Sequence, residues 1–336
     1  MMDYEMFKAL AERKLSDYLP EEYKAAEVTV KTISKVNQKK EVLNIMEADA
    51  PSGTVSPNLY LDEMYRKYEE CGDLEKVFRE AADFYVENAH IKTPEVIRNI
   101  TPEFVKENLV MAMVNTESNH ELLKDIPHRE INDCSVIYRL VFDLNKRGMT
   151  STIFDNSFAE KMGLSEQELF VMATENTKRM LPTVVKPMSE VIMEMVTVDG
   201  MPKEVAEMMI GELKPEDEKM WIITNDYGLN GAVNMLYEDN LHKLAGELND
   251  DLYILPSSVH EVICVPASTA TPEDLAQMVL EINMNQVALE ERLSNQVYHY
   301  DKDLRKLTMA TDTPNKRIDG MVAEQALIYE AKEQQR

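Results

Sequence analysis

Runs of β-branched and aromatic residues occur in pairs along this chain, and only a few residues separate the members of each pair. "EVTVKTISKV" is followed by "EVLNIM" after the polar sequence "NQKK", and "LYILP" is followed by "HEVICVP". Such pairs with short connections are typical of β-hairpins. Helical segments alternate with them, so the sequence predicts an α+β fold of antiparallel sheets and packed helices, in two or three subdomains.

Helices are predicted from apolar residues that recur every three or four positions and from capping signals at their ends. An apolar stripe over residues 4–18 ends before Pro20, and Asp73 is placed to cap a helix that reaches Asn88. Thr271, followed by a proline and two acids, opens a helix that we expect to run to about Leu293. Further helical regions are expected over residues 59–71, over the methionine-rich residues 155–213 and over residues 231–248.

The order of these elements divides the chain into four segments. Residues 1–90 form an N-terminal segment of a helix, a hairpin and two further helices. Residues 91–214 carry strands followed by methionine-rich helices, and residues 215–310 form a C-terminal α+β segment that contains the "LPSSVHEV" hairpin. The last segment, residues 311–336, is a polar tail.

The chain is strongly acidic, because 61 Asp and Glu against 36 Lys and Arg give a formal net charge of −25. Such a charge repels nucleic-acid phosphates and anionic lipid, so neither a nucleic acid nor a membrane is expected as a partner. Acids and bases are interleaved, as in "YRKYEECGDLEKVFREAADFY", which is typical of solvated helix faces. An acidic mimic of nucleic acid that antagonises a nucleic-acid enzyme stays open as an alternative.

Three further features predict a cytoplasmic protein. Cys71, Cys134 and Cys264 are odd in number and far apart, as in proteins whose thiols stay reduced. The sequence "MMDYEMFKALAERK" carries charges throughout and lacks the apolar stretch of a signal peptide. No apolar run approaches the ~18 residues that would span a bilayer.

The most chemically suggestive stretch is "LPSSVHEVICVP", residues 255–266. Its "HEVIC" differs from the zinc motif H-E-x-x-H by a cysteine in place of the second histidine, and that motif requires a helix. On a strand, which rises ~3.3 Å per residue, His260 and Cys264 would lie about 13 Å apart and could not share one ion. The histidines form no other pair at chelating spacing, so neither a metal nor a cofactor is expected.

Two interpretations of this stretch remain. Ser257 or Ser258 at the turn could meet His260 or Glu261 and form the site of a hydrolase or transferase, although the G-x-S-x-G elbow is absent. In the structural interpretation the stretch is a tight hairpin, whose serines bond local backbone and whose apolar residues supply core.

Two other stretches carry polar residues next to predicted strands. "NDYGLNGAVNMLYE" is interpreted as a capping turn with Asn230 at the start of a helix, because its glycines lack the spacing of a phosphate-binding loop. "PHREINDCSVIYR" is interpreted as a local ion-pair network at the entrance of a strand; its members are His128, Arg129, Glu130 and Asp133.

Six blocks of the sequence together resemble one known family: "NLYLDEMYRKYEECGDLEKVF", "IPHREINDCSVIYRL", "ATENTKRMLP", "NDYGLNGAVNMLY", "DLYILPSSVHEVICVP" and "ERLSNQVYHYD". That family is the bacterial domain-of-unknown-function family DUF5688, and the resemblance covers about residues 4–309. It implies a bacterial cytoplasmic protein and supplies no activity, cofactor or catalytic residue.

The leading hypothesis for function is a non-enzymatic protein that binds another protein. It rests on the lack of a convergent catalytic set, of metal-ligand spacing and of a cofactor loop, together with the acidic composition. The hydrolase or transferase at Ser257, Ser258, His260 and Glu261 is the first alternative, and the acidic mimic is the second. The sequence makes no prediction of an oligomeric state.

The charge of the chain leads to a first testable prediction. We expect no appreciable binding of duplex DNA, because the net charge of −25 repels its phosphates. A fluorescence anisotropy titration at ~0.15 M salt measures this, and an affinity within the ~10⁻⁴–10⁻⁶ M range of non-specific binders would contradict it.

Overall fold

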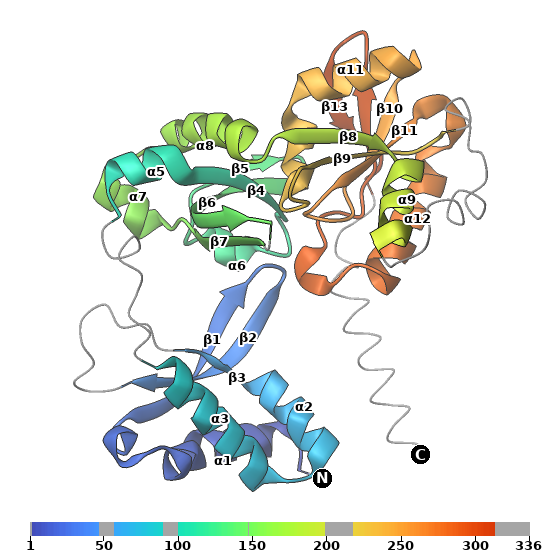
Figure 1. The fold of residues 1–336 in the computed structure, drawn as a ribbon. Coiled ribbons are helices and arrows are strands. Elements are labelled where there is room, and N and C mark those ends of the chain that lie inside the picture. The colour runs from blue at the N-terminus through green and yellow to red at the C-terminus, as the bar shows by residue number, and fades with distance from the viewer. Residues whose placement is uncertain (1, 47–56, 90–99, 147, 199–217, 313–336) are drawn as a thin grey trace, which may run out of the picture. The chain divides into compact units, whose positions relative to one another are not determined.

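The chain divides into two compact units, Met1–Thr101 and Pro102–Arg336, and each is described by itself (Figure 1). The structure is a computed structural model that describes residues 2–46, 57–89, 100–146, 148–198 and 218–312. No helix within these ranges is both long and apolar enough to cross a membrane.

In its described residues, the N-terminal unit packs three helices against one small sheet. Its strands have the order β1-β2-β3 and pair antiparallel. One apolar core joins the elements and includes Phe7, Leu43 and Phe78. The elements are α1 (Tyr4–Lys14), short 3-10 turns at Leu15–Tyr18 and Glu21–Tyr23, β1 (Glu27–Lys35), β2 (Gln38–Met46), β3 (Leu59–Tyr60), α2 (Leu61–Cys71) and α3 (Leu74–Asn88).

The predicted first hairpin is present, but its turn is tighter than expected. Lys35 pairs with Gln38, so only Val36 and Asn37 form the turn. Asn37 has a φ of 58°, in the left-handed region that asparagine tolerates better than most residues. The remaining residues of "NQKK", Gln38 to Lys40, therefore belong to β2. Lysine does not distinguish a turn from a strand here, because it is common in both when they are exposed to solvent.

The second predicted boundary in this unit is confirmed. Gly72 has a φ of 69° and ends α2, and the Asp73 side chain accepts the Lys76 N–H at 3.1 Å to cap α3. The predicted helix over residues 59–71 begins two residues later than expected, because Leu59 and Tyr60 pair with β2 as a short strand.

The described part of the C-terminal unit contains two antiparallel sheets. In the four-stranded sheet, β6 (Cys134–Asn145) pairs with β4 (Leu109–Asn115), β5 (His128–Ile131) and β7 (Gly148–Ile153). The six-stranded sheet has the order β13-β12-β10-β11-β9-β8. Its strands are β8 (Thr183–Pro187), β9 (Trp221–Asn225), β10 (Leu252–Leu255), β11 (Val262–Pro266), β12 (Tyr298–Asp301) and β13 (Lys306–Met309).

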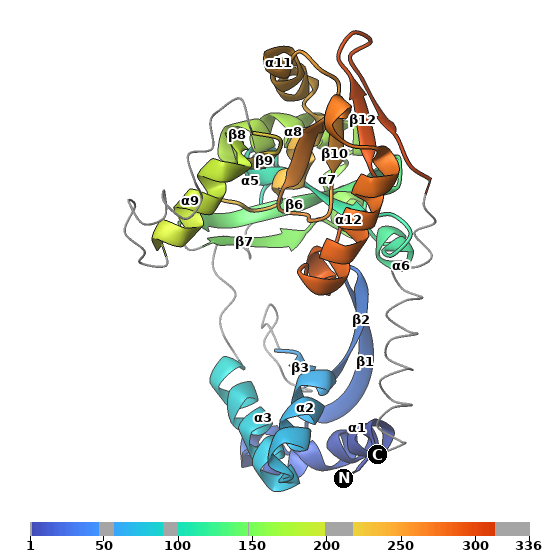
Figure 2. The ribbon, with the colours of Figure 1, turned by 90° about the vertical axis from the view of Figure 1, so that its right-hand side faces the viewer.

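Helices cover both sheets of this unit. Helix α8 packs on β4 (Figure 1), and α12 covers a face of the six-stranded sheet (Figure 2), where Leu275 and Val279 meet Leu255 and Val265. The helices are α5 (Pro102–Asn108), α6 (His120–Leu123), α7 (Asn156–Met162), α8 (Glu166–Met180), α9 (Met188–Val198), α11 (Glu238–Leu248) and α12 (Pro272–Asn285), with 3-10 turns η4 (Gly231–Leu236), η5 (Ala267–Thr269) and η6 (Leu289–Glu291).

Three predicted helices differ from the structure. The methionine-rich region is interrupted by β8, because Pro182 ends α8 and β-branched Val184 and Val185 then pair with β9; residues 199–213 lie outside the described residues. The helix predicted over residues 231–248 breaks at the extended residue Tyr237 into η4 and α11. Helix α12 begins as predicted, with Thr271 as its cap, but ends at Asn285.

The predicted fold class is confirmed, since helices and sheets are both present and every described strand pair is antiparallel. The division of the chain into the segments 1–90, 91–214, 215–310 and 311–336 stays a prediction.

The strand pair of β10 and β11 leads to a stability prediction. Val262 is fully buried and pairs with Ile223 of β9. We expect Val262→Ala to lower the free energy of unfolding by about 1–3 kcal/mol, because two buried methyl groups are lost. Val185→Ala on edge strand β8 is the control, since that side chain is exposed. Urea unfolding measures both, and equal losses would contradict the burial of Val262.

Candidate functional site

The loop of residues 256–261 between β10 and β11 is not the tight turn that the sequence predicts. Strand β10 ends at Leu255 and β11 begins at Val262, so six residues lie between the two strands. Their backbone groups bond the segment that follows η6 instead: Leu293 N–H donates to Ser257 C=O at 3.0 Å, and Ser294 N–H donates to Pro256 C=O at 2.9 Å. The carbonyl groups of the loop are therefore satisfied by a distant segment of the same chain, and the loop does not need the hydrogen bonds of a tight turn.

Both serines of this loop are buried. The Ser258 hydroxyl accepts the backbone N–H of His260 at 3.0 Å, which is the local bond expected of a structural serine. Ser258 also forms an antiparallel bridge with Arg292. No hydrogen bond among the described residues joins Ser257 or Ser258 to the imidazole of His260 or to Glu261.

The imidazole of His260 is engaged at both nitrogens. Its Nδ1 accepts the backbone N–H of Asn230 at 3.3 Å, which requires the tautomer with the hydrogen on Nε2. That Nε2 lies 3.4 Å from Oε1 of Glu291, a residue of η6. A histidine held in this way has no free nitrogen to take a proton from a serine.

The same loop packs closely on the segment from β9 to η4. The carbonyl of His260 accepts the Thr224 hydroxyl at 2.8 Å. A Cβ atom at Gly231 would lie 2.3 Å from that carbonyl oxygen, so only glycine fits there. Asn230 occupies the predicted cap position, with a φ of 52°. The predicted capping hydrogen bond is wrong, because the Asn230 side chain makes no such bond.

Asparagine side chains occupy the interior of the β9–η4 segment. Asn225 Oδ1 accepts the Tyr227 N–H at 3.0 Å, and its Nδ2 donates to Leu229 C=O at 2.7 Å. Asn234 donates to both Thr224 C=O and Gly231 C=O at 2.9 Å. These bonds close the segment on itself, so its polar groups serve the fold.

Asp133 joins the two sheets of the C-terminal unit. It lies in the two-residue turn between β5 and β6, and its Oδ2 accepts the Ser294 hydroxyl at 2.6 Å. Its Oδ1 accepts the Tyr298 hydroxyl. The same hydroxyl lies 3.6 Å from the Cys134 thiol, and burial raises the pKa of both Tyr298 and Cys134.

The predicted ion-pair network around residues 128–133 is therefore not local. Arg129 pairs with Glu166 of α8 at 2.6 Å, and the Tyr138 hydroxyl donates to the same carboxylate at 2.5 Å. Partial burial opposes ionisation of Glu166, but the hydrogen bonds from Arg129 and Tyr138 outweigh it and lower the pKa of this carboxyl. The guanidinium also lies 3.9 Å from the centre of the Phe170 ring.

The sequence-based search missed the bonds of Asp133, because 161 and 165 residues separate it from Ser294 and Tyr298. One signal pointed to them. The blocks "IPHREINDCSVIYRL" and "ERLSNQVYHYD" both carry the family resemblance, and these two blocks contain the three residues.

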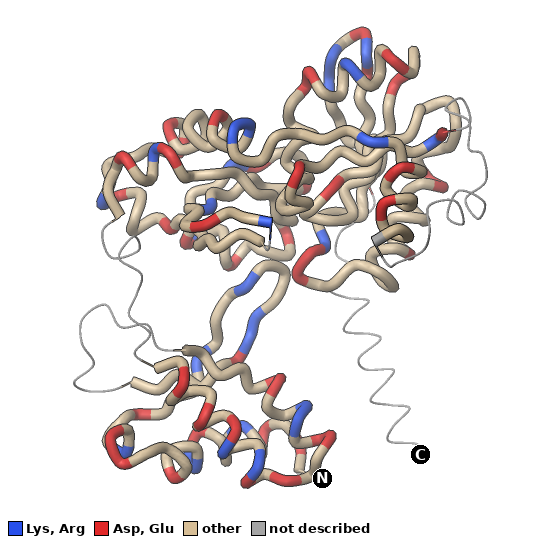
Figure 3. The backbone as a smooth tube through the Cα atoms, in the orientation of Figure 1, with Lys and Arg blue, Asp and Glu red and all other residues tan. Residues whose placement is uncertain are grey.

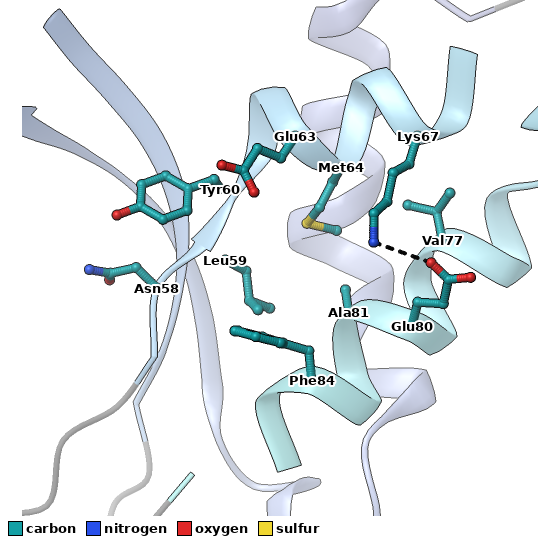
Figure 4. A pocket seen from close by; sticks show the side chains of 10 residues that line it. All are labelled: Asn58, Leu59, Tyr60, Glu63, Met64, Lys67, Val77, Glu80, Ala81 and Phe84. Carbon is teal, nitrogen blue, oxygen red and sulfur yellow. Dashed lines mark hydrogen bonds and ion pairs between the residues drawn. The ribbon is translucent and has the colours of Figure 1, made fainter. Parts of the chain in front are cut away.

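A cavity of about 310 Å³ lies in the N-terminal unit between β3, α2 and α3 (Figure 4). Leu59, Met64, Val77 and Ala81 form its apolar walls and are buried. Phe84 also lines it, yet half of that side chain (50%) is exposed. The sequence-based search did not identify this cavity, because its apolar residues fit the helix periodicity of an ordinary core.

Charged side chains stand around the cavity. Lys67 of α2 and Glu80 of α3 form an ion pair at 3.3 Å, and Glu63 lies on the β3 side (Figure 4). The lining residues, which are completed by Asn58 and Tyr60, include no serine, threonine, cysteine or histidine. The cavity can hold an apolar group between charges of both signs.

Metal-ligating residues do not cluster in the part of the chain that the structure describes. No group of three or more His, Cys, Asp and Glu side chains in those ranges is arranged to hold an ion.

Comparison with known proteins identifies one family. A family model described as "Family of unknown function (DUF5688)" matches residues 4–302. No curated protein and no solved structure matches the chain.

The Asp133 bonds lead to a prediction about polar packing. Tyr298→Phe removes one of the two hydroxyl groups on the Asp133 carboxylate, and we expect a loss of about 1–3 kcal/mol in the free energy of unfolding. The control is Tyr300→Phe on the same strand. Its hydroxyl donates to Glu238 at 2.6 Å, but solvent can replace it there, because the Glu238 side chain is 40% exposed. Denaturant unfolding at neutral pH compares the two, and an equal or larger loss for Tyr300→Phe would contradict the prediction.

Proposed function

The chain belongs to the DUF5688 family, and because the description of that family names no activity, we propose from the structure that it is a non-enzymatic protein-binding module. We place the binding site in the cavity of the N-terminal unit. The occupant that fits is a short segment of a partner protein with one apolar anchor side chain and charged neighbours.

The half-exposed ring of Phe84 is the observation that carries this proposal. An aromatic ring left open beside a cavity loses apolar burial that folding alone could have gained, and a partner's side chain would recover it. Glu63, Lys67 and Glu80 surround this apolar centre with charge. A centre of this kind with a polar rim is the usual composition of a protein interface.

The enzyme hypothesis receives less support from the loop of residues 256–261. A hydrolase there needs Ser257 or Ser258 next to a free nitrogen of His260, but both nitrogens face other groups and the Ser258 hydroxyl faces backbone. Glu261 is not bonded to any of the three. The geometry favours a structural role for Ser257, Ser258 and His260.

The acidic-mimic hypothesis also receives less support. Mimicry of nucleic acid requires carboxylates in a continuous stripe, whereas Lys and Arg are interspersed with Asp and Glu along the backbone (Figure 3). The cytoplasm remains the location we propose, since Cys134 and Cys264 are buried free thiols and such thiols persist in a reducing compartment.

Phe84→Ala tests the proposal. The full chain and this variant are immobilised, exposed to lysate of the source organism, and the retained proteins are compared by quantitative mass spectrometry. We expect at least one partner to be depleted about tenfold by the variant, because truncation of a central aromatic anchor commonly costs ~2 kcal/mol or more.

Met6→Ala is the matched control, because Met6 belongs to the same unit and is 60% exposed but lies on α1, outside the cavity lining. It should retain the partners of the unmodified chain. The proposal fails if Phe84→Ala retains them equally well, or if both variants lose the same set.

A further inference from the structure

We propose that the outer half of β1 binds an extended acidic segment of a partner protein as an additional strand of the N-terminal sheet. This inference rests on the proposed protein-binding function and adds a second surface to it. Two observations carry it: an unpaired strand edge and a group of lysines beside that edge.

Strand β1 forms an edge of its sheet, since β2 is the only strand that pairs with it among the described residues. The Val30 N–H donates to Glu12 of α1 at 2.9 Å, so the backbone of Val30 points away from β2. Backbone direction alternates along a strand, and therefore Thr32 and Ser34 also point their N–H and C=O groups outward. Both are exposed, and these groups have no hydrogen-bond partner within the described residues.

The edge is basic in an otherwise acidic chain. Lys31, Lys35, Lys39 and Lys40 fall within ten residues that contain no Asp or Glu, against a net charge of −25 for the whole chain. They lie on the hairpin of β1 and β2 (Figure 3).

Most of these lysines have no described carboxylate partner. Lys40 forms an ion pair with Asp62. The Lys31 ammonium donates to the Asn44 side chain at 2.8 Å, and the Lys35 ammonium lies 6.0 Å from the centre of the Tyr60 ring. Neither of them, nor Lys39, is in an ion pair with a described acid. A carboxylate placed along the edge would therefore meet cations that are not already neutralised.

The same charges select the kind of occupant. A second copy of this chain, paired edge to edge through β1, would bring Lys31 and Lys35 close to the same lysines of the other copy. Like charges on neighbouring strands are unfavourable. A nucleic acid could bind the lysines through its phosphates, but it could not form the regular backbone hydrogen bonds of a paired strand with the N–H and C=O groups of β1. An acidic peptide in extended form satisfies both the charges and the backbone.

A labelled nine-residue peptide that alternates Glu with Val and Thr tests the inference against the full chain, by fluorescence anisotropy. Two control peptides are used: one with Lys in place of Glu, and one of equal charge with Pro at alternate positions. We expect the acidic peptide to bind and to weaken with added salt. The Lys peptide should not bind, and the Pro peptide should bind at least about tenfold more weakly, since Pro cannot donate to a ladder.

Ser34→Pro removes an outward N–H and leaves the bonds to β2, because proline is tolerated at such edge positions. It should weaken the acidic peptide at least about tenfold, whereas Ser34→Ala should leave the affinity unchanged. If Ser34→Pro does not fold, hydrogen exchange on the unmodified chain decides: the amides of Thr32 and Ser34 should gain protection when the peptide is added.

Three results would overturn the inference: equal binding of the acidic and Pro peptides, no gain of protection at Thr32 and Ser34, or displacement of the peptide by duplex DNA. Phe84→Ala should bind the peptide as the unmodified chain does, because its ring lies in the cavity. A chain that loses its cellular partner through Phe84→Ala but binds no acidic peptide would leave the proposed function standing and reject the edge site alone.

Discussion

The carboxylate of Asp133 is the interaction on which the C-terminal unit depends. A charged group that is drawn into a fold must be fully hydrogen-bonded, or its desolvation outweighs what its contacts contribute. Ser294 and Tyr298 supply hydroxyl groups to its two oxygens, and the backbone N–H of Gln296 in turn donates to the Ser294 hydroxyl at 2.8 Å. One turn of the four-stranded sheet is thereby tied to one strand of the six-stranded sheet and to the segment that precedes it.

The conformation of the histidine-bearing loop follows from that tie. Because Ser294 is held by Asp133, its backbone and that of Leu293 are in position to pair with Pro256 and Ser257. The carbonyl groups of Pro256 and Ser257 are then not available for the hydrogen bonds of a tight turn. In this conformation the His260 imidazole lies next to the backbone N–H of Asn230. Ser258 and His260, which look catalytic in the sequence, are therefore engaged in hydrogen bonds and close contacts that hold the fold.

Local signals in the sequence predicted most of the helices and strands, but contacts between residues far apart in the sequence could not be predicted from it. Periodicity and capping chemistry act within a few residues, so the caps Asp73 and Thr271 were predictable. The bonds of Asp133 connect positions more than 160 residues apart, and no local pattern encodes such a distance. Strand β8 was missed for a different reason, since its few residues lie inside a region whose composition favours helix.

The two units differ in how much of their chemistry the fold itself uses. In the C-terminal unit, the Ser258 hydroxyl and both imidazole nitrogens of His260 already face other groups of the fold, which leaves little of them for a partner. In the N-terminal unit, Phe84 is half exposed, the outer edge of β1 pairs with no described strand, and Lys31, Lys35 and Lys39 stand beside it without described carboxylates. Recognition depends on groups that folding leaves unsatisfied, because only these gain free energy when a partner arrives. On that physical ground we assign recognition to the N-terminal unit, and an anchor in the cavity and an acidic strand on the edge would each supply what its surface lacks.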